Sequence, residues 1–360
     1  AAYSIGAARR HRPEHAVLPE DALVMCSFGD ASANHSTAQG AFNTAQWTSY
    51  QSVPLPLLFV CEDNGIGIST KTPKGWIEAT FSARPGLTYF KADGLDLYDT
   101  YRVAAEAAEF VRTRKKPAFL HLRTIRLYGH AGADVPTTYL PREEVEAEEA
   151  QDPLLHSVRL LDQAGVLDAQ SALAVYRDTC ARVERVAGDA VKRPRLKTAS
   201  EVMASLVPPK RECKPTNGPT SEARADAFGA DLKAMDEPQI MSRIINWALT
   251  DLMLAHREIV MMGEDVGRKG GVYGVTQKLT ARFGPDRMID TLLDEQSILG
   301  LAIGMAQNGF VPMPEIQFLA YLHNAEDQLR GEAATLSFFS KGAFTNPMVL
   351  RIAGLGYQKG

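Results

Sequence analysis

Two apolar runs near the start of the chain, each ending in small and acidic residues, constrain the fold most strongly. Leu23–Phe28 is followed by Gly-Asp, and Leu55–Cys61 is followed by Glu-Asp-Asn-Gly. A stretch with helical spacing, Ala41–Tyr50, lies between them. Short runs that are apolar throughout and alternate with helices are typical of a parallel sheet covered on both faces. The sequence therefore predicts a doubly wound α/β fold.

The next hundred residues continue this alternation. A strand is expected over Tyr89–Ala92 and another over Ala118–Leu127. Between them, Asp96 is expected to cap a helix over Leu97–Lys115, because Val103, Ala107, Phe110 and Val111 share one face. Residues 141–205 are expected to be mostly helical.

The alternating pattern returns in the second half. Ser242 is expected to cap a helix, Ile259–Met262 to form a strand that ends in Gly-Glu-Asp, and Ile298–Gln307 to form a helix. Further strands are expected over Val311–Phe318 and Met348–Ala353. The stretch Pro208–Pro238 is rich in Pro, Lys, Asp and Gly and has no periodicity, which is typical of a linker. We expect an α/β domain over residues 1–205, a linker over 206–237 and a second α/β domain over 238–360.

Composition excludes several classes of protein. The net charge of −4 gives no basic surface for nucleic acid. The longest apolar run, Ile298–Ala306, is far shorter than the roughly 20 residues that span a bilayer, so no membrane association is expected. The four cysteines match no zinc site or disulfide framework. Cys26 and Cys61 are expected to be buried and reduced, which fits a cytoplasmic location.

The two strand ends of the first half carry groups that suit a metal ion. Gly29-Asp30-Ala31-Ser32 follows the first run, and Glu62-Asp63-Asn64-Gly65 follows the second. Ligands of parallel α/β sheets bind beyond the carboxyl ends of strands. Asp30 and Asn64 offer the hard oxygen donors that Mg²⁺ prefers. The alternative is that these residues only cap turns.

The segment that joins these two strand ends resembles the thiamine-diphosphate-binding motif, which is Gly-Asp-Gly, a helix, a strand and Asn-Asn. The two key residues, Asp30 and Asn64, are separated by 64 − 30 = 34 positions, a longer gap than usual. Two further departures are Ala31 in place of the second Gly and Asp63 in place of the first Asn.

Two longer stretches resemble the decarboxylating component of 2-oxo acid dehydrogenases. The α portion of that family is matched by a strand that runs into Arg126-Leu127-Tyr128-Gly129-His130. The β portion is matched by GEDVGRKGGVYGVT, DTLLDEQSILGLAIGMAQNGFVPMPEIQF and AYLHNAEDQLRGEAA. The resemblance implies that α and β portions are fused in one chain, and that the start of α and the end of β are missing.

The resemblance implies roles for individual residues at the diphosphate end of the cofactor. Asp30, Asn64 and the backbone carbonyl of Ile66 would hold Mg²⁺, which would bind the diphosphate of thiamine diphosphate. The residues that would line the diphosphate and the thiazolium ring are Gly29, Ala31, Ser32 and Ile68. The methyl of Ala31 requires an unstrained φ at that turn.

The resemblance places a second group of residues at the aminopyrimidine ring. Glu295 would bond to the ring and promote loss of the thiazolium proton, while the cofactor performs the chemistry. Leu293, Gln317 and Tyr321 would pack around the ring. The alternative for Glu295 is an acidic residue that only favours the N-terminus of a helix.

His130 follows a strand, and the resemblance places it near the diphosphate and the active centre. There it could stabilise charge or relay a proton during acyl transfer. Ala131 follows it, where some relatives carry a regulated Ser, so phosphorylation at this position is excluded. The loop from Ala131 to Asp152 is expected to change between order and disorder.

The implied activity is oxidative decarboxylation of a 2-oxo acid and transfer of the acyl group to a lipoyl-bearing dihydrolipoyl acyltransferase. Branched-chain 2-oxo acids are favoured over pyruvate. A homo-oligomer is expected, because residues from both halves must touch one cofactor. Two alternatives stay open: a thiamine-diphosphate transferase of the transketolase type, and a fragment of the parent enzyme without catalytic activity.

Overall fold

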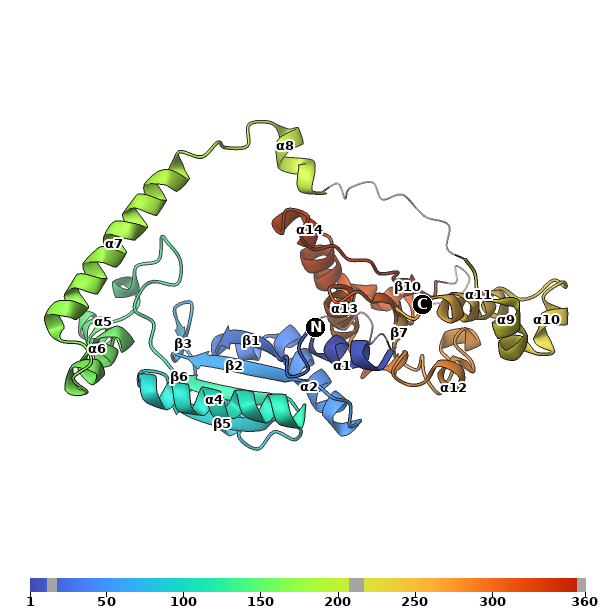
Figure 1. The fold of residues 1–360 in the computed structure, drawn as a ribbon, viewed down its shortest axis with the longest axis horizontal. Helices are drawn as coiled ribbons and strands as arrows, with labels where there is room; N and C mark the ends of the chain where they lie inside the picture. Colours follow the sequence, from blue (N-terminus) through green and yellow to red (C-terminus); the bar gives the residue numbers. More distant parts are fainter. Residues whose placement is uncertain (12–17, 207–216, 355–360) are drawn as a thin grey trace. The chain divides into compact units, whose positions relative to one another are not determined.

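The computed structural model describes residues 1–11, 18–206 and 217–354, which form two compact units (Figure 1). The N-terminal sheet unit comprises Leu23–Gln39 and Leu57–Val202. The C-terminal sheet unit comprises Ala1–Ala22, Gly40–Pro56 and Met203–Gly360. The predicted domain limits at residues 205 and 238 stay a prediction.

The N-terminal sheet unit is built on four parallel strands in the order β1-β2-β6-β5. They are β1 (Val24–Gly29), β2 (Leu57–Asp63), β5 (Thr88–Asp93) and β6 (Ala118–Arg123). Helix α4 (Leu97–Arg114) covers one face through Val103, Ala107 and Val111, and helix α3 (Trp76–Phe81) covers the other, where Phe81 stacks on Phe119. Asp96 caps α4 by accepting hydrogen bonds from the backbone N–H groups of Tyr98 and Asp99, as the sequence predicts.

The remaining elements of this unit are short or lie in the helical stretch after the sheet. They are η2 (Ala31–Asn34), β3 (Ile66–Gly67), β4 (Thr70–Lys71), η3 (Pro136–Thr138), α5 (Arg142–Glu149), α6 (Pro153–Gln163) and α7 (Ala169–Val191). Helix α2 (Ser36–Tyr50) and helix α8 (Ala199–Met203) each contain a boundary between the two units.

The C-terminal sheet unit repeats the architecture with four parallel strands in the order β10-β9-β7-β8. They are β7 (Ile259–Gly263), β8 (Met288–Asp290), β9 (Val311–Ile316) and β10 (Arg351–Ile352). Helix α11 (Met241–Ala255) packs Leu249 and Met253 on one face. Helix α13 (Glu295–Ala306) packs Leu299 beside Ile316 of β9. Both sheets are parallel and carry helices on both faces, which confirms the predicted fold class.

Further helices complete this unit. They are α1 (Ala2–His11), η4 (Ala204–Leu206), α9 (Ser221–Phe228), α10 (Asp231–Ala234), η5 (Val272–Gly274), α12 (Leu279–Phe283), η6 (Leu319–Ala325), η7 (Gln328–Ala333) and α14 (Leu336–Phe339).

Within the C-terminal sheet unit, helices from the first 56 residues pack against α13 because small residues allow close approach. Helix α1 contacts α13, where a Cβ on Gly304 would overlap the backbone nitrogen of Ala1. A Cβ on Gly40 of α2 would overlap the carboxylate of Asp294. The indole nitrogen of Trp47 donates a hydrogen bond to the carbonyl of Asp290 at 3.3 Å. The α2 segment is thereby held against the N-terminus of α13.

Two local expectations differ from the structure. Cys26 is exposed rather than buried, because β1 is an edge strand of its sheet, whereas Cys61 on the inner strand β2 is buried. Helix α11 begins at Met241, so Ser242 lies inside it and does not cap it.

The stretch expected to be a linker contains α9 and α10. The side chain of Thr220 caps α9, and Arg224 ties that helix to Asp251 of α11 at 2.9 Å. Residues 207–216 of the expected linker lie outside the described residues.

Arg287 is a buried cation that fastens α11 to β7. Its guanidinium donates to the carbonyls of Met253, His256 and Ile259 at 2.7–3.0 Å. Burial lowers the pKa of Arg287 to about 10. We expect Arg287→Met to lower the free energy of unfolding by about 3 kcal/mol, because three carbonyls lose their donor. Urea unfolding followed by Trp fluorescence measures this.

The control for that measurement is Arg10→Met, which removes an exposed guanidinium paired with Asp286 at 2.7 Å. A surface pair contributes at most about 1 kcal/mol. Equal losses in the two variants would contradict the structural role of Arg287.

Candidate functional site

The ends of β1 and β2 bring the first group of predicted residues to one edge of the N-terminal sheet. The parallel register sets Gly29 opposite Glu62, so Asp30 and Asp63 follow at the same edge. Asp30 is only 1% exposed. Its Oδ2 accepts a hydrogen bond from the hydroxyl of Thr72, while its Oδ1 has no partner among the described residues. A buried carboxylate oxygen without a partner is costly, so this atom suits a cation.

Asn64 lies in the turn that follows β2. Its Oδ1 accepts a hydrogen bond from the backbone N–H of Ile66 at 3.2 Å, which leaves a second lone pair on this oxygen. Residues Ile66–Gly67 then pair with Thr70–Lys71 in a small hairpin. One carboxylate, one amide and one backbone carbonyl form the hard donor set typical of Mg²⁺ sites that also bind phosphate. Among the described residues, no three His, Cys, Asp or Glu side chains are grouped so that they could hold a metal. The predicted ligand set contains only one side chain of these four types, that of Asp30.

Asp63, which departs from the family motif, has a structural partner that sequence reasoning missed. Its Oδ2 lies 2.9 Å from Nε2 of the buried His121, whose Nδ1 lies 2.6 Å from the hydroxyl of Tyr89. Its Oδ1 accepts from the backbone N–H of Gly65 at 3.2 Å. The hydrogen bond with His121 lowers the pKa of Asp63. This carboxylate therefore fixes the turn that carries Asn64.

Ala31, the other departure, lies in η2 against the hairpin after Asn64. A Cβ at position 67 would overlap the methyl of Ala31, so only Gly fits there. The extra methyl is thus accommodated by a glycine across from it. Ser32 is exposed in the same short helix.

His130 is exposed, in a loop linked to Ile68 by a chain of hydrogen bonds. The backbone N–H of His130 donates to Asp134 at 2.7 Å, and the hydroxyl of Tyr139 donates to the same carboxylate at 2.8 Å. Arg126 donates to the Tyr139 oxygen at 2.7 Å and to the Ile68 carbonyl at 2.6 Å. The bond from His130 is the main reason that the pKa of Asp134 is lowered.

Ile68 itself is exposed and has a φ of +56°, which is rare for a β-branched residue. Strain of this kind gathers at functional sites. The Arg126 bond to its carbonyl helps to hold that conformation.

The second group of predicted residues lies in the C-terminal sheet unit, around the N-terminus of α13. Glu295 is in the first turn and is 4% exposed. The side-chain amide of Asn324 donates to its Oε2 at 3.2 Å. A helix N-terminus does not require its carboxylate to be buried, since the dipole also stabilises an exposed one.

Glu264, at the end of β7, is a neighbour that the sequence reasoning did not assign. Burial, followed by the charges of Glu295, Asp265 and Asp294, raises its pKa to about 7. Its Oε1 is buried without a partner among the described residues. The signal was present in the sequence, because Glu264 belongs to the quoted Gly-Glu-Asp-Val segment at a strand end.

The other residues predicted at the ring differ in exposure. The amide of Gln317 donates to the backbone carbonyl of Glu264 at 3.3 Å, which joins it to the same cluster. Leu293 is 81% exposed, and Tyr321 is exposed with an edge-on contact to Phe318 at 5.8 Å. These two side chains are free to receive a ligand. The binding roles of all these residues stay predictions.

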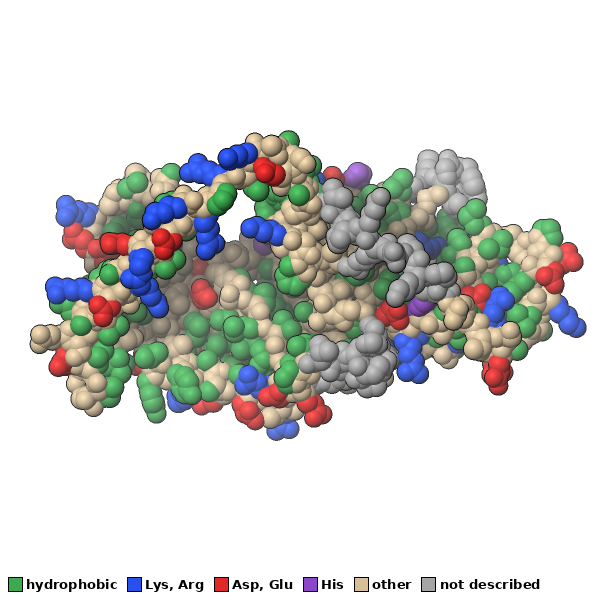
Figure 2. All heavy atoms as spheres, turned by 45° about the horizontal axis from the view of Figure 1, so that its top comes forward, with side chains coloured by type: hydrophobic (Ala, Val, Ile, Leu, Met, Phe, Trp, Pro, Cys, Tyr) green, Lys and Arg blue, Asp and Glu red, His purple; other side chains and the backbone are tan. Residues whose placement is uncertain are grey.

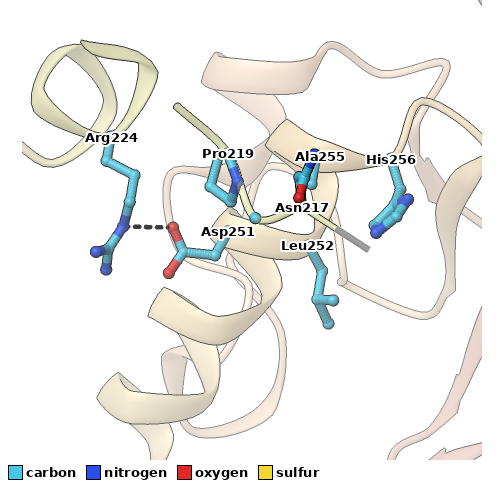
Figure 3. Close-up of a pocket in the computed structure, with 8 residues that line it drawn as sticks. Asn217, Pro219, Arg224, Asp251, Leu252, Ala255 and His256 are labelled. Atoms are coloured by element: carbon cyan, nitrogen blue, oxygen red, sulfur yellow. Dashed lines mark hydrogen bonds and ion pairs between the residues drawn. The ribbon is translucent and has the colours of Figure 1, made fainter. Parts of the chain in front are cut away.

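A separate pocket of about 340 Å³ lies beside α9 and α11 (Figure 3). The ion pair of Arg224 with Asp251 borders it, and His256 lies at the other side. None of the predicted site residues lines it.

Charges on the face drawn in Figure 2 are mixed, with Lys and Arg interspersed among Asp and Glu. No helix of the described residues is both long enough and apolar enough to cross a membrane.

The raised pKa of Glu264 predicts a pH-dependent effect on stability. The folded chain keeps Glu264 neutral up to about pH 7, whereas an unfolded chain ionises it near pH 4.5. Its contribution to folding is therefore full below pH 4.5 and is lost as the pH rises to 7. Glu264→Gln should raise the free energy of unfolding by on the order of 1 kcal/mol at pH 8. At pH 4 the same substitution should change the free energy of unfolding little. Urea titrations at both pH values measure this, with Glu326→Gln as an exposed control; an equal effect at both pH values would contradict it.

Comparison with known proteins finds two family models along the chain. The model of the family described as dehydrogenase E1 component matches residues 4–199. The model described as transketolase, pyrimidine binding domain matches residues 238–359.

Curated relatives match about a third of the chain. A 3-methyl-2-oxobutanoate dehydrogenase subunit beta of Mycobacterium tuberculosis is 42% identical over 116 residues, 32% of this chain and 33% of that protein. A pyruvate dehydrogenase E1 component subunit beta of Staphylococcus epidermidis is 41% identical over 111 residues, 31% of this chain and 34% of that protein. The chain thus spans about a third of the length of these relatives. The two family models, in this order along one sequence, show that the chain belongs to the dehydrogenase E1 component family and carries a transketolase-type pyrimidine-binding domain.

Proposed function

We propose that the chain binds thiamine diphosphate and Mg²⁺ as the decarboxylating component of a 2-oxo acid dehydrogenase. The observation that carries the proposal is the buried Oδ1 of Asp30, which lacks a partner among the described residues at the strand end where the family motif lies. A divalent cation would satisfy this oxygen, and the diphosphate would complete the shell of the cation. Family membership makes thiamine diphosphate the implied ligand.

In this proposal, Asp30, Asn64 and the Ile66 carbonyl hold the metal. Gly29, Ala31, Ser32 and Ile68 line the diphosphate and the thiazolium ring. Two contacts support a preformed site: Asp63 fixes the Asn64 turn through His121, and Gly67 leaves room for Ala31. Preorganised ligands bind with a smaller loss of conformational entropy.

When bound, the cofactor would supply a carbon nucleophile and an acceptor for the charge that decarboxylation leaves on carbon. Glu295 would hold the aminopyrimidine ring, and its carboxylate would favour the protonation state in which the thiazolium carbon can lose its proton. The Asn324 amide keeps the Glu295 carboxylate in place. Leu293, Gln317 and Tyr321 border the ring.

His130 donates or accepts a proton near the reacting carbon in this proposal. The Arg126–Tyr139–Asp134 chain of hydrogen bonds orders its loop. Loss of any link would free the loop that was predicted to change between order and disorder.

The proposed substrate is a branched-chain 2-oxo acid, and the proposed acyl acceptor is a lipoyl-bearing dihydrolipoyl acyltransferase. The relatives support a 2-oxo acid as the class of substrate. They do not distinguish branched-chain acids from pyruvate, because a branched-chain and a pyruvate enzyme subunit match almost equally. Assembly as a homo-oligomer and a cytoplasmic location belong to the proposal.

The metal assignment predicts the behaviour of Asp30→Asn. This variant keeps the shape and a hydrogen-bonding atom for Thr72 but loses the charge, so thiamine diphosphate should bind at least about tenfold more weakly at a fixed Mg²⁺ concentration. Asn64→Ala should act in the same direction. Isothermal titration calorimetry measures both, with Glu62→Gln as the control because Glu62 is an exposed carboxylate at the same sheet edge. Parental affinity in Asp30→Asn would contradict the assignment.

The role of Glu295 predicts a separation of binding from proton loss. Glu295→Gln should bind thiamine diphosphate about as well as the parent chain. Exchange of the thiazolium hydrogen with deuterated water, followed by NMR after acid quench, should slow by about 10²–10⁴. The control is Glu258→Gln, at the opposite end of β7. Unchanged exchange in Glu295→Gln would show that Glu295 is only a helix-end residue.

A further inference from the structure

Helix α7 of the N-terminal sheet unit is a 23-residue amphipathic helix with no buried side chain. It begins at a capped end, where the Asp168 side chain accepts from the backbone N–H of Ser171 at 2.7 Å. Its apolar side chains are nevertheless exposed, among them Tyr176 at 64% and Val183 at 58%. A helix in water gains little stability by itself, and most of its stability comes from packing of an apolar face.

Seven of the apolar residues of α7 form a stripe with a spacing of alternately three and four positions. The stripe consists of Ala169, Leu173, Tyr176, Cys180, Val183, Ala187 and Ala190. This is the a/d pattern of a coiled coil. From Leu173 to Ala190 the stripe runs 17 residues, or about 26 Å along the helix axis.

We propose that this stripe pairs with α7 of a second copy of the chain, with the two helices antiparallel. In the stripe, Leu173, Cys180 and Ala187 occupy the a position, and the other four residues occupy the d position. In the antiparallel arrangement each a position faces a d position of the second copy. Leu173 then lies opposite Ala190, Tyr176 opposite Ala187, and Cys180 opposite Val183. Every layer combines a larger side chain with a smaller one, so the distance between the helix axes stays even along the pair.

The charges that flank the stripe support the antiparallel direction. Arg177 and Glu184 both occupy the e position, and neither makes an ion pair or hydrogen bond within the described residues. In the antiparallel pair the e positions face one another, so Arg177 of each copy meets Glu184 of the other. The symmetry of the dimer makes two such pairs from one sequence.

A parallel pair fits less well. It would set Tyr176 against Tyr176 and, three layers on, Ala187 against Ala187, which demands different distances between the axes. It would also face Glu184 with Thr179, leaving the charges without partners. The sequence of α7 thus selects both a second copy as the occupant and the direction of the pairing.

The first test uses charge reversal, measured by sedimentation equilibrium on the full chain. Arg177→Glu creates two like-charge contacts and should weaken self-association about tenfold. Adding Glu184→Arg to this variant reverses both partners and should restore parental association. The control is Arg185→Glu, which makes the same charge change on the opposite face of α7 and should have no effect. A parent chain without self-association, a double variant that stays weak, or an equal effect of Arg185→Glu would each overturn the proposal.

The second test fixes the direction of the helices by disulfide trapping. In a background where Cys26, Cys180 and Cys213 are replaced by Ser, Leu173→Cys and Ala190→Cys chains are made separately and then mixed in a glutathione redox buffer. The antiparallel pair predicts a mixed disulfide between the two variants and little disulfide in either variant alone. Disulfides within each separate variant would show a parallel pair, and absence of any disulfide would show that another surface covers α7; both outcomes overturn the proposal.

Discussion

The buried carboxylate of Asp30 is the constraint on which the candidate site depends. A parallel sheet ends two neighbouring strands at one edge, and the chain puts an ionisable group into a nearly water-free position there. One oxygen of Asp30 is bonded by Thr72, and the other has no partner among the described residues. Hydrogen bonds could have satisfied both oxygens. An oxygen kept available at a cost in stability is a feature expected of a ligand site.

The C-terminal sheet also holds a partly buried carboxylate, that of Glu264, at the end of a strand. Burial raises the pKa of the Glu264 carboxyl, and the nearby charge of Glu295 adds to the effect. Helix α2 contacts the N-terminus of α13 through Gly40 and through the Trp47 bond to the Asp290 carbonyl, and α1 contacts α13 near its C-terminal end, at Gly304. Residues from the first 56 positions therefore support the element that carries Glu295, which explains why that compact unit is discontinuous in sequence.

Periodicity and motif spacing predicted the architecture, because apolar strands in a parallel sheet leave a strong pattern. The cap at Asp96 followed from local chemistry alone. The exposure of Cys26 could not be predicted in this way, because it depends on the order of the strands in the sheet and not on the composition of β1. The partnership of Asp63 with His121 joins residues 58 positions apart and has no local signal. The contact between Gly67 and Ala31 has no local signal either. The Ala at position 31, where the family motif has Gly, is explained only by the absence of a side chain at position 67.

The central claim is that Asp30, Asn64 and the Ile66 carbonyl hold a divalent cation that binds the cofactor diphosphate. The most direct measurement is a crystal structure of the chain grown with thiamine diphosphate and Mn²⁺ in place of Mg²⁺, with anomalous scattering used to locate the ion. The account predicts an anomalous peak between Asp30 and Asn64, with a diphosphate oxygen in its coordination shell. A fully occupied cofactor whose metal lies away from Asp30, or an Asp30 Oδ1 that bonds only to water in that complex, would contradict it.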